Sequence, residues 1–167
     1  MLRNKKILIT GATGFIGANA ARYFLKKGAR VFIFTRAVSD KWRVRDILRD
    51  VSEYRVDLMD SVKLKRAVKA IKPNVIIHTA VYGGYPLQNN TAKIIGANFT
   101  GTVNLINASI NTGFELFINT GSSSEYGIKS KPMRETDLLK PINEYGVTKA
   151  AAALYCRKRP KKKIFPL

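Results

Sequence analysis

Three glycines in the stretch GATGFIG constrain the fold more than any other part of the sequence. They stand at positions 11, 14 and 17, directly after the apolar run KILIT at 6–10 and before a helical pattern at 15–27. The first glycine allows a tight turn, the second lets a backbone approach a pyrophosphate, and the third permits close packing of helix on strand. An ordinary turn between a strand and a helix rarely needs all three. The stretch therefore predicts a dinucleotide-binding unit.

Strand-like and helix-like segments alternate along the rest of the chain. Further strands are predicted at 30–35, 54–58, 74–80 and 115–121. Helices are predicted at 61–72, from 90 or 91 to 113, and at 143–158, with one or two helical turns near 42–50. Such alternation implies right-handed crossovers and a parallel sheet covered on both faces. We therefore predict a Rossmann-type, doubly wound α/β fold of about five strands in the order 3-2-1-4-5, in one domain over residues 1–158.

The composition indicates a globular protein with a strong positive charge. The net charge is +19, from 30 Lys and Arg against 11 Asp and Glu. These basic residues are scattered, which favours a solvated basic surface over a nucleic-acid site, with attraction of nucleotide phosphates as a third interpretation. No apolar run reaches the roughly 20 residues that span a bilayer. Cys156 is the only cysteine, which fits the reducing cytoplasm, and no metal site is predicted.

The end of the second predicted strand bears on the choice of cofactor. It reads FTR, without the acidic residue that binds both ribose hydroxyls of NAD. Arg36 stands there instead, and its guanidinium could pair with a 2′-phosphate in a bidentate way, assisted by Arg43 or Lys41. We therefore expect NADP(H) to be preferred over NAD(H). The alternative is that Arg36 is one more solvated basic residue.

Two polar motifs follow in the second half of the chain. EYGVTK places Tyr145 and Lys149 four residues apart on the predicted helix, and hence on one face. A neighbouring ammonium favours the phenolate and lowers the pKa of a tyrosine, whose ordinary value of about 10 makes it a poor base. GSSSEYG at 121–127 leaves the strand 115–121 at the carboxyl edge of the sheet, where ligands bind. Alone, these motifs are typical of a surface pair and a turn; with the glycine turn they predict a catalytic site.

In this order, the motifs resemble those of the extended short-chain dehydrogenase/reductases, the NAD(P)-dependent nucleotide-sugar epimerase/dehydratase family. The matching stretches, from residue 6 to about 156, are GATGFIG, VDL at 56–58, HTA at 78–80, NFTGT at 98–102, GSSSEYG and YGVTK. The resemblance implies an NAD(P)-dependent enzyme with a nucleotide-sugar substrate. It also implies a homodimer through the helices at 91–112 and 143–158.

By position, the resemblance assigns catalysis to Ser122, Tyr145 and Lys149, with Ser123 replacing Ser122 if the loop lacks one residue. Tyr145 would be the acid/base, and Lys149 would hold the ribose and tune Tyr145. Further cofactor contacts would fall on Gly11, Thr13, Gly14, Phe15, Ile16, Gly17, Asp57, Leu58, Ala80 and Asn98. Tyr82, Ser123 and Ser124 would face the substrate. The only histidine, His78, is predicted to be structural.

The reaction within the family stays open among 4-keto-sugar reduction, C4 epimerisation and 4,6-dehydration. The dehydratases carry an acidic pair just after the catalytic Ser or Thr, where this sequence has Ser123 and Ser124. Glu125 could supply one acid only if the alignment has a gap. The loop VYGGYP at 81–86, together with Arg36, favours reduction or epimerisation.

The basic tail is interpreted as the mark of a truncation. Six of the eleven residues at 157–167 are Lys or Arg, and the resemblance stops near Arg157, whereas family members continue into a substrate domain. We predict no strand in 159–167, an unpaired edge at 115–121, and cofactor binding with little turnover. The alternative is an inactive Rossmann module that uses its basic surface on nucleic acid or a protein partner.

Overall fold

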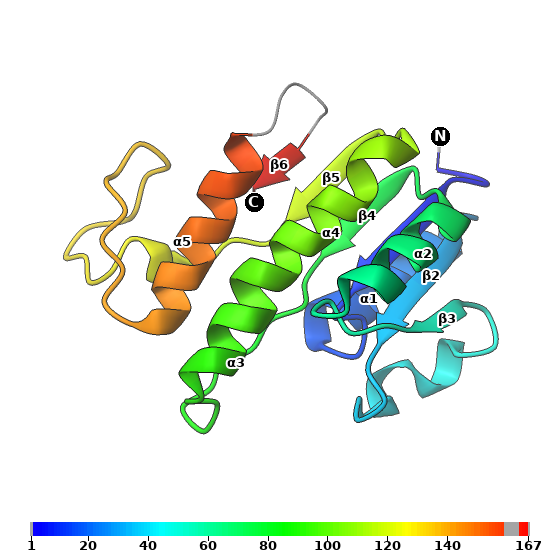
Figure 1. The fold of residues 1–167 in the computed structure, drawn as a ribbon, viewed down its shortest axis with the longest axis horizontal. Coiled ribbons are helices and arrows are strands. Elements are labelled where there is room, and N and C mark those ends of the chain that lie inside the picture. Colours follow the sequence, from blue (N-terminus) through cyan, green and yellow to red (C-terminus); the bar gives the residue numbers. More distant parts are fainter. Residues whose placement is uncertain (1, 159–163, 167) are drawn as a thin grey trace.

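Six parallel strands form the centre of the fold, in the order β3-β2-β1-β4-β5-β6 (Figure 1). The computed structural model describes residues 2–158 and 164–166. The strands are β1 (Lys6–Thr10), β2 (Arg30–Thr35), β3 (Ser52–Arg55), β4 (Val75–His78), β5 (Leu116–Asn119) and β6 (Ile164–Pro166). The predicted doubly wound fold and the order 3-2-1-4-5 of the first five strands are therefore confirmed.

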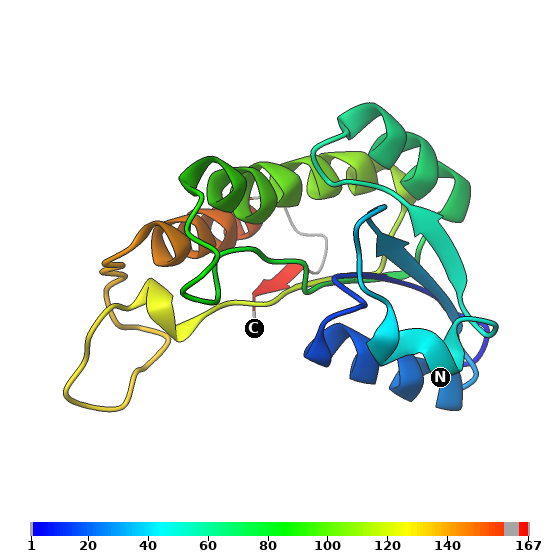
Figure 2. The same cartoon turned by 90° about the horizontal axis from the view of Figure 1, so that it is seen from below.

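Helices cover both faces of this sheet, as Figure 2 shows. On one face lie α2 (Ser61–Ile71), α4 (Gly101–Ser109) and α5 (Glu144–Arg157), and on the other lie α1 (Phe15–Lys26) and the 3₁₀ turn η1 (Trp42–Ile47). The predicted helix from 90 or 91 to 113 is one continuous rod in four parts. These are α3 (Thr91–Ile95), the π-helical turn η2 (Gly96–Thr100), α4 and the 3₁₀ turn η3 (Ile110–Thr112).

Alternate residues of each strand point to opposite faces, so the sheet buries two apolar clusters. Leu8 faces α2 and α4, whereas its neighbours Ile7 and Ile9 face α1. All three are fully buried. Strands with two covered faces carry continuous apolar runs, which explains why KILIT and its counterparts could be recognised in the sequence.

The third and sixth strands differ from the sequence prediction. β3 begins two residues earlier than predicted and ends at Arg55, because Asp57 Oδ1 accepts the backbone N–H of Met59 and turns the polypeptide. The expectation that the tail forms no strand is wrong, since Ile164–Pro166 pair with β5. β5 is therefore not an edge. The remaining tail residues, 159–163 and 167, lie outside the described part of the protein.

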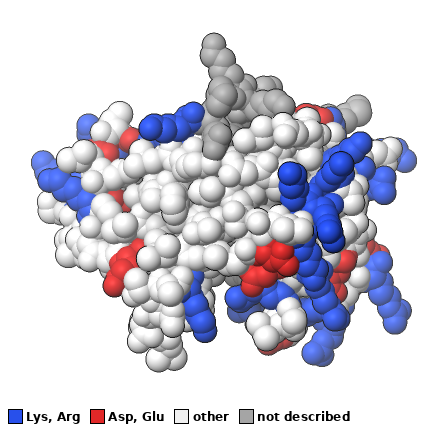
Figure 3. Space-filling model, in the orientation of Figure 1, with Lys and Arg blue, Asp and Glu red and all other residues white. Residues whose placement is uncertain are grey.

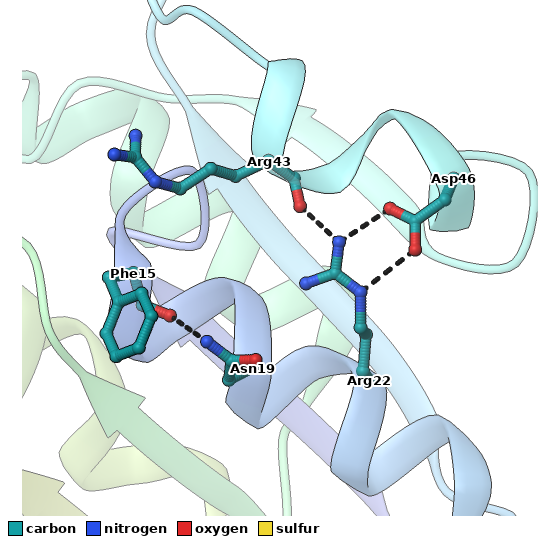
Figure 4. A network of polar contacts seen from close by, with 5 residues as sticks. All are labelled: Phe15, Asn19, Arg22, Arg43 and Asp46. Carbon is teal, nitrogen blue, oxygen red and sulfur yellow. Dashed lines mark hydrogen bonds and ion pairs between the residues drawn. The ribbon is translucent and has the colours of Figure 1, made fainter.

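An ion pair fixes the segment that follows β2 onto α1 (Figure 4). Arg22 Nε and Nη2 donate to the two carboxylate oxygens of Asp46 at 2.9 and 2.7 Å, and Nη2 also donates to the carbonyl oxygen of Arg43. The hydrogen bond from Arg22 lowers the pKa of Asp46. The side chain of Arg43 points away from this pair, towards the end of α1 at which Phe15 lies (Figure 4).

Candidate functional site

The glycine turn joins β1, β4 and α1 so closely that a side chain fits at neither Gly11 nor Gly17. Gly11 has a φ of +67°, and a Cβ added to it would lie 2.6 Å from the backbone nitrogen of Ala80. A Cβ on Gly17 would lie 2.4 Å from the carbonyl oxygen of Gly11. Gly14 donates its N–H to that same oxygen at 2.9 Å. The structure thus brings Gly11 close to Gly17 and to Ala80, while the predicted contact of Ala80 with a cofactor stays a prediction.

The N-terminus of α1 has the properties of an anion site. Its N-cap is Gly14, which offers no side-chain cap, and its first turn contains no acidic residue. The first N–H groups of a helix have no partner within the helix, and together with the helix dipole they favour phosphate. Phe15 and Ile16 are 75% and 61% exposed, which is unusual for such large apolar side chains. The glycine turn and this helix end therefore fit the pyrophosphate of a dinucleotide. Thr13 is half-buried within the turn, and its contact with a cofactor stays a prediction.

The residues predicted for the adenine end follow β2 and β3. Leu58 is buried against α4, where Asn104 Nδ2 donates to its carbonyl oxygen at 2.9 Å, while Asp57 is exposed. Arg36 is exposed directly after β2, and its N–H donates to Ser39 Oγ. Lys41 forms an ion pair with Glu53. Lys41 and Arg43 were predicted to assist Arg36 in binding a phosphate, and of the two only Arg43 is not held by Glu53. The Arg43 guanidinium stacks on Trp42, with Cζ 4.1 Å from the ring centroid.

His78 ends β4 inside a buried series of hydrogen bonds. Thr102 Oγ1 donates its proton to the carbonyl oxygen of Asn98 at 2.6 Å. In the hydrogen bond between Thr102 Oγ1 and His78 Nε2, the histidine nitrogen is therefore the donor. His78 Nδ1 then accepts from Thr10 Oγ1. Burial, with a smaller contribution from the charge of Lys149, lowers the pKa of His78 to about 3. A neutral ring held at both nitrogens fits the predicted structural role.

Asn98 occupies the π-helical turn and ties three segments together. Its Oδ1 accepts the N–H of Tyr82 at 2.9 Å, and its Nδ2 donates to the carbonyl oxygen of Tyr82 and to Thr148 Oγ1 at 2.8 and 3.1 Å. The side chain is 2% exposed, so it positions the loop at 81–86 against α5. π-helical turns inside α-helices are frequent at functional sites. Direct contact of Asn98 with a cofactor stays a prediction.

Tyr145 and Lys149 lie on α5, which is capped by Asn143. The Tyr145 ring faces the loop at 81–86, since a Cβ on Gly84 would lie 4.0 Å from its hydroxyl. Lys149 is 5% exposed, and its Nζ donates to the carbonyl oxygen of Thr120, just after β5. Burial lowers the pKa of Lys149, whereas the charge of Glu125 opposes that shift. An ammonium with three donors keeps two of them for other partners.

The serine motif forms a tight turn that packs on α5. Ser122 is the N-cap of η4 (Ser123–Glu125), and its Oγ accepts the N–H of Ser124 at 3.2 Å. A Cβ on Gly146 would lie 2.5 Å from the carbonyl oxygen of Ser124, so helix and turn touch directly next to Tyr145. Ser123 is exposed and Ser124 half-buried. Ser122, Ser123 and Glu125 line an open cavity of about 950 Å³.

Two features of this site escaped the sequence prediction. Asn98 and Thr148 are 50 residues apart, so no local pattern announces their hydrogen bond. Glu125 was considered only as an acid for dehydration, yet it forms a capping box with Ser122. The spacing of Ser122 and Glu125 is the signal that could have shown this, because a capping box places the acid three residues after the serine.

Comparison with known proteins agrees with this geometry. The model of the NAD dependent epimerase/dehydratase family matches residues 7–165, so the similarity extends beyond Arg157, where it was expected to stop. The chain is 28% identical to a UDP-glucose 4-epimerase of Lactobacillus helveticus over 146 residues, which are 86% of this chain and 44% of that protein.

Two solved structures share the fold. The UDP-Glc/GlcNAc 4-epimerase from Campylobacter jejuni aligns with a TM-score of 0.88 and 28% identity, over 98% of this chain and 52% of that one. The UDP-glucose 4-epimerase from Brucella ovis, in complex with NAD, aligns with a TM-score of 0.81 and 26% identity, over 92% and 47% of the two chains. Like the first curated relative, both are about twice as long as the part that this chain matches.

Proposed function

Because this chain belongs to the NAD dependent epimerase/dehydratase family, we propose that it is the cofactor-binding part of an enzyme acting on C4 of a nucleotide sugar. The reaction is C4 epimerisation or reduction of a 4-keto sugar. One observation carries the proposal: the glycine turn packs on the end of β4, and Lys149 and the serine turn lie at the end of the neighbouring strand β5, so all three share the carboxyl edge of one sheet. Dehydration is less well supported, because Ser123 and Ser124 stand where an acidic pair is required.

Each polar group has a definite task in this proposal. The glycine turn and the N-terminus of α1 would hold the pyrophosphate, and the chemistry supplied by the bound nicotinamide is reversible hydride transfer. Tyr145 would take the proton of the sugar hydroxyl or return it. Lys149 has donors left for a ribose hydroxyl and lies one helical turn after Tyr145 on the same face of α5. Ser122 Oγ accepts from Ser124 and so keeps its own proton to donate to the sugar oxygen.

NADP(H) is the cofactor that the polar groups beyond β2 favour. Arg36 is exposed there, and Arg43 points to the end of α1 that would bind the pyrophosphate (Figure 4). The carboxylate of Glu53, on the neighbouring strand β3, is already held by Lys41 and Thr35 Oγ1, which lower its pKa. The position directly after β2, where an acidic residue would bind the ribose hydroxyls of NAD, is occupied by Arg36 instead. NAD(H) stays possible as a weaker ligand.

A homodimer would form through the surface of α3, α4 and α5. These helices lie side by side on one face (Figure 1), and Ile95, Val147 and Leu154 are each about half exposed there. Figure 3 shows that this surface is largely uncharged, whereas Lys and Arg gather around α2. Light scattering at micromolar concentration should give twice the protomer mass of 18.6 kDa. A strictly monomeric mass would contradict the dimer.

The experiment that tests the function is hydride transfer with defined substrates. The purified protein is incubated with NADPH and a panel of nucleotide 4-keto sugars, and the nicotinamide absorbance is followed. We expect cofactor binding with low turnover, because contacts to the substrate's nucleotide raise the rate and this chain spans only about half the length of the relatives it matches. Rapid turnover would refute the low-activity expectation. Retention on DNA that weakens with salt, without binding of either cofactor, would instead support the inactive binding module.

A further inference from the structure

A buried carboxylate lies directly behind the serine turn. Glu125 is 5% exposed, and its Oε1 accepts the backbone N–H of Ser122 at 2.8 Å. The backbone of Glu125 is fixed as well, since its N–H donates to the carbonyl oxygen of Ser122 and its carbonyl oxygen accepts from the N–H of Lys140, both at 3.1 Å. Side chain and backbone of Glu125 are therefore both bonded to the turn that holds Ser122.

The charges around Glu125 connect it to α5. Burial raises the pKa of Glu125, while the N–H of Ser122 and the charges of Lys149 and Arg157 oppose that shift. Both cations belong to α5. Burial lowers the pKa of Lys149, and two neighbouring groups raise it again. The charge of Glu125 has the larger effect and Cys156 the smaller one. The geometry agrees, because Lys149 Nζ donates to the carbonyl oxygen of Thr120, only two residues before Ser122, whose N–H donates to the Glu125 carboxylate.

No other described group facing Lys149 supplies a full negative charge at neutral pH. Burial raises the pKa of the Cys156 thiol to about 11, so this thiol is protonated. The ring of His78 is neutral, since its pKa is lowered to about 3. A buried ammonium without a counter-charge is costly and tends to lose its proton. Among these three groups, Glu125 is therefore the one whose charge opposes the effect of burial on the pKa of Lys149.

From this geometry we propose that Glu125 is a positioning residue, whose carboxylate holds the backbone of Ser122 and balances the buried ammonium of Lys149. The proposal rests on the proposed function, in which Ser122 donates to the sugar oxygen and Lys149 binds the ribose beside Tyr145. Glu125 itself touches neither substrate nor cofactor in this scheme. One side chain would then set the orientation of the serine and the charge of the lysine.

Three variants separate these two effects. Glu125→Gln keeps an oxygen for the Ser122 N–H but removes the charge, whereas Glu125→Ala removes both. Glu135→Gln is the matched control, because exposed Glu135 lines the same cavity but has no part in the pKa shift of Lys149. The measurements are hydrogen exchange of the Ser122 amide and the pH titration of the Lys149 Cε chemical shift, both by NMR on the protein without cofactor.

In Glu125→Gln, the Ser122 amide should stay protected while the titration midpoint of Lys149 falls by about one pH unit. In Glu125→Ala, protection should be lost as well, and Glu135→Gln should behave like the unaltered protein. A purely structural role for Glu125 would leave the Lys149 midpoint unchanged in Glu125→Gln, and this result would overturn the proposal. Should Glu125→Ala fail to fold, the Glu125→Gln titration decides alone.

A second readout links the proposal to binding. As the pH rises, NADPH affinity should decline when Lys149 loses its proton. Because the Lys149 midpoint is lower in Glu125→Gln, this decline should occur at a lower pH in the variant than in the unaltered protein. If the unaltered protein binds no cofactor, the proposed function fails, while the NMR titration still tests Glu125. If cofactor binds but both proteins share one pH profile and one Lys149 midpoint, the positioning role fails and the proposed function stands.

Discussion

Replacing Gly11 with alanine tests the contact on which the cofactor cradle depends. The substitution acts in two ways, since Gly11 has a φ of +67° and the new Cβ would lie 2.6 Å from both the backbone nitrogen of Ala80 and the carbonyl carbon of Thr79. Backbone atoms that leave a central strand move aside far less readily than the end of a flexible side chain. β1 and β4 must separate, or the turn must change its shape.

The expected loss can be worked out by comparison with Gly113. A left-handed conformation costs a residue with a Cβ about 1–2 kcal/mol, and this applies at both positions, since Gly113 has a φ of +75°. Forcing extra volume into a packed site costs about 1–3 kcal/mol more, and this applies to Gly11 alone, because nothing lies within 4 Å of a Cβ on Gly113. Gly11→Ala should therefore cost about 2–5 kcal/mol and Gly113→Ala about 1–2 kcal/mol.

Urea unfolding followed by circular dichroism measures both free energies. The reduction of unfolded-state entropy is the same for the two substitutions and cancels in the comparison. Gly11→Ala should also lose NADPH binding, while Gly113→Ala, far from the cradle, should retain it. Equal destabilisation of the two variants, with binding intact in both, would refute the close contact between β1 and β4.

Three further predictions concern single polar groups. Arg36→Ala should weaken NADPH binding tenfold or more and leave NADH binding unchanged, because a charge-assisted hydrogen bond contributes about 1.5–3 kcal/mol. Equal affinities of the unaltered protein for NADPH and NADH would rule out binding of the 2′-phosphate by Arg36. In the unfolded protein His78 binds a proton below its ordinary pKa of 6.5, whereas in the folded protein it does so only below a pKa of about 3. Lowering the pH from about 7.5 to about 5 should therefore reduce the free energy of unfolding by about 2 kcal/mol. His78→Gln should lack this part of the loss in urea unfolding, and an unchanged loss would contradict the neutral buried ring. Asn98→Ala leaves the N–H and carbonyl of Tyr82 without their partner and should cost about 1–3 kcal/mol for each unsatisfied buried group; unaltered thermal stability would speak against the tie between that loop and α5.

The elements that the sequence predicted well are those with strong local patterns. β1, β2 and β4 carry continuous apolar runs because both faces of the sheet are covered, and the three glycines mark the turn after β1. The Tyr145–Lys149 face follows from helical spacing alone. The expected cofactor turn, helix α5 and serine turn could therefore be assigned to one edge of the sheet from the sequence alone.

The features that could not be predicted depend on contacts between distant segments. The π-helical turn has no signature in NFTGT, and it becomes meaningful only through the hydrogen bonds of Asn98 to Tyr82 and Thr148. β6 contains only three residues, too few for a periodic pattern, and it is defined by its pairing with β5. The bond from Ser122 to Glu125 could have been read from spacing, but the burial of Glu125 behind the turn could not.

Chemical-shift mapping by NMR with NADP⁺ tests most directly the claim that this protein holds a nicotinamide cofactor beside a Tyr–Lys pair. Increasing amounts of NADP⁺ are added to the labelled protein, and the amide shifts are followed residue by residue. The largest changes should fall on the glycine turn at 11–17, on Arg36 and Ala80, and on α5 around Tyr145, with Gly113 and the outer face of α2 unaffected. An absence of saturable shifts, or shifts confined to the basic face of α2, would contradict the proposed cofactor site.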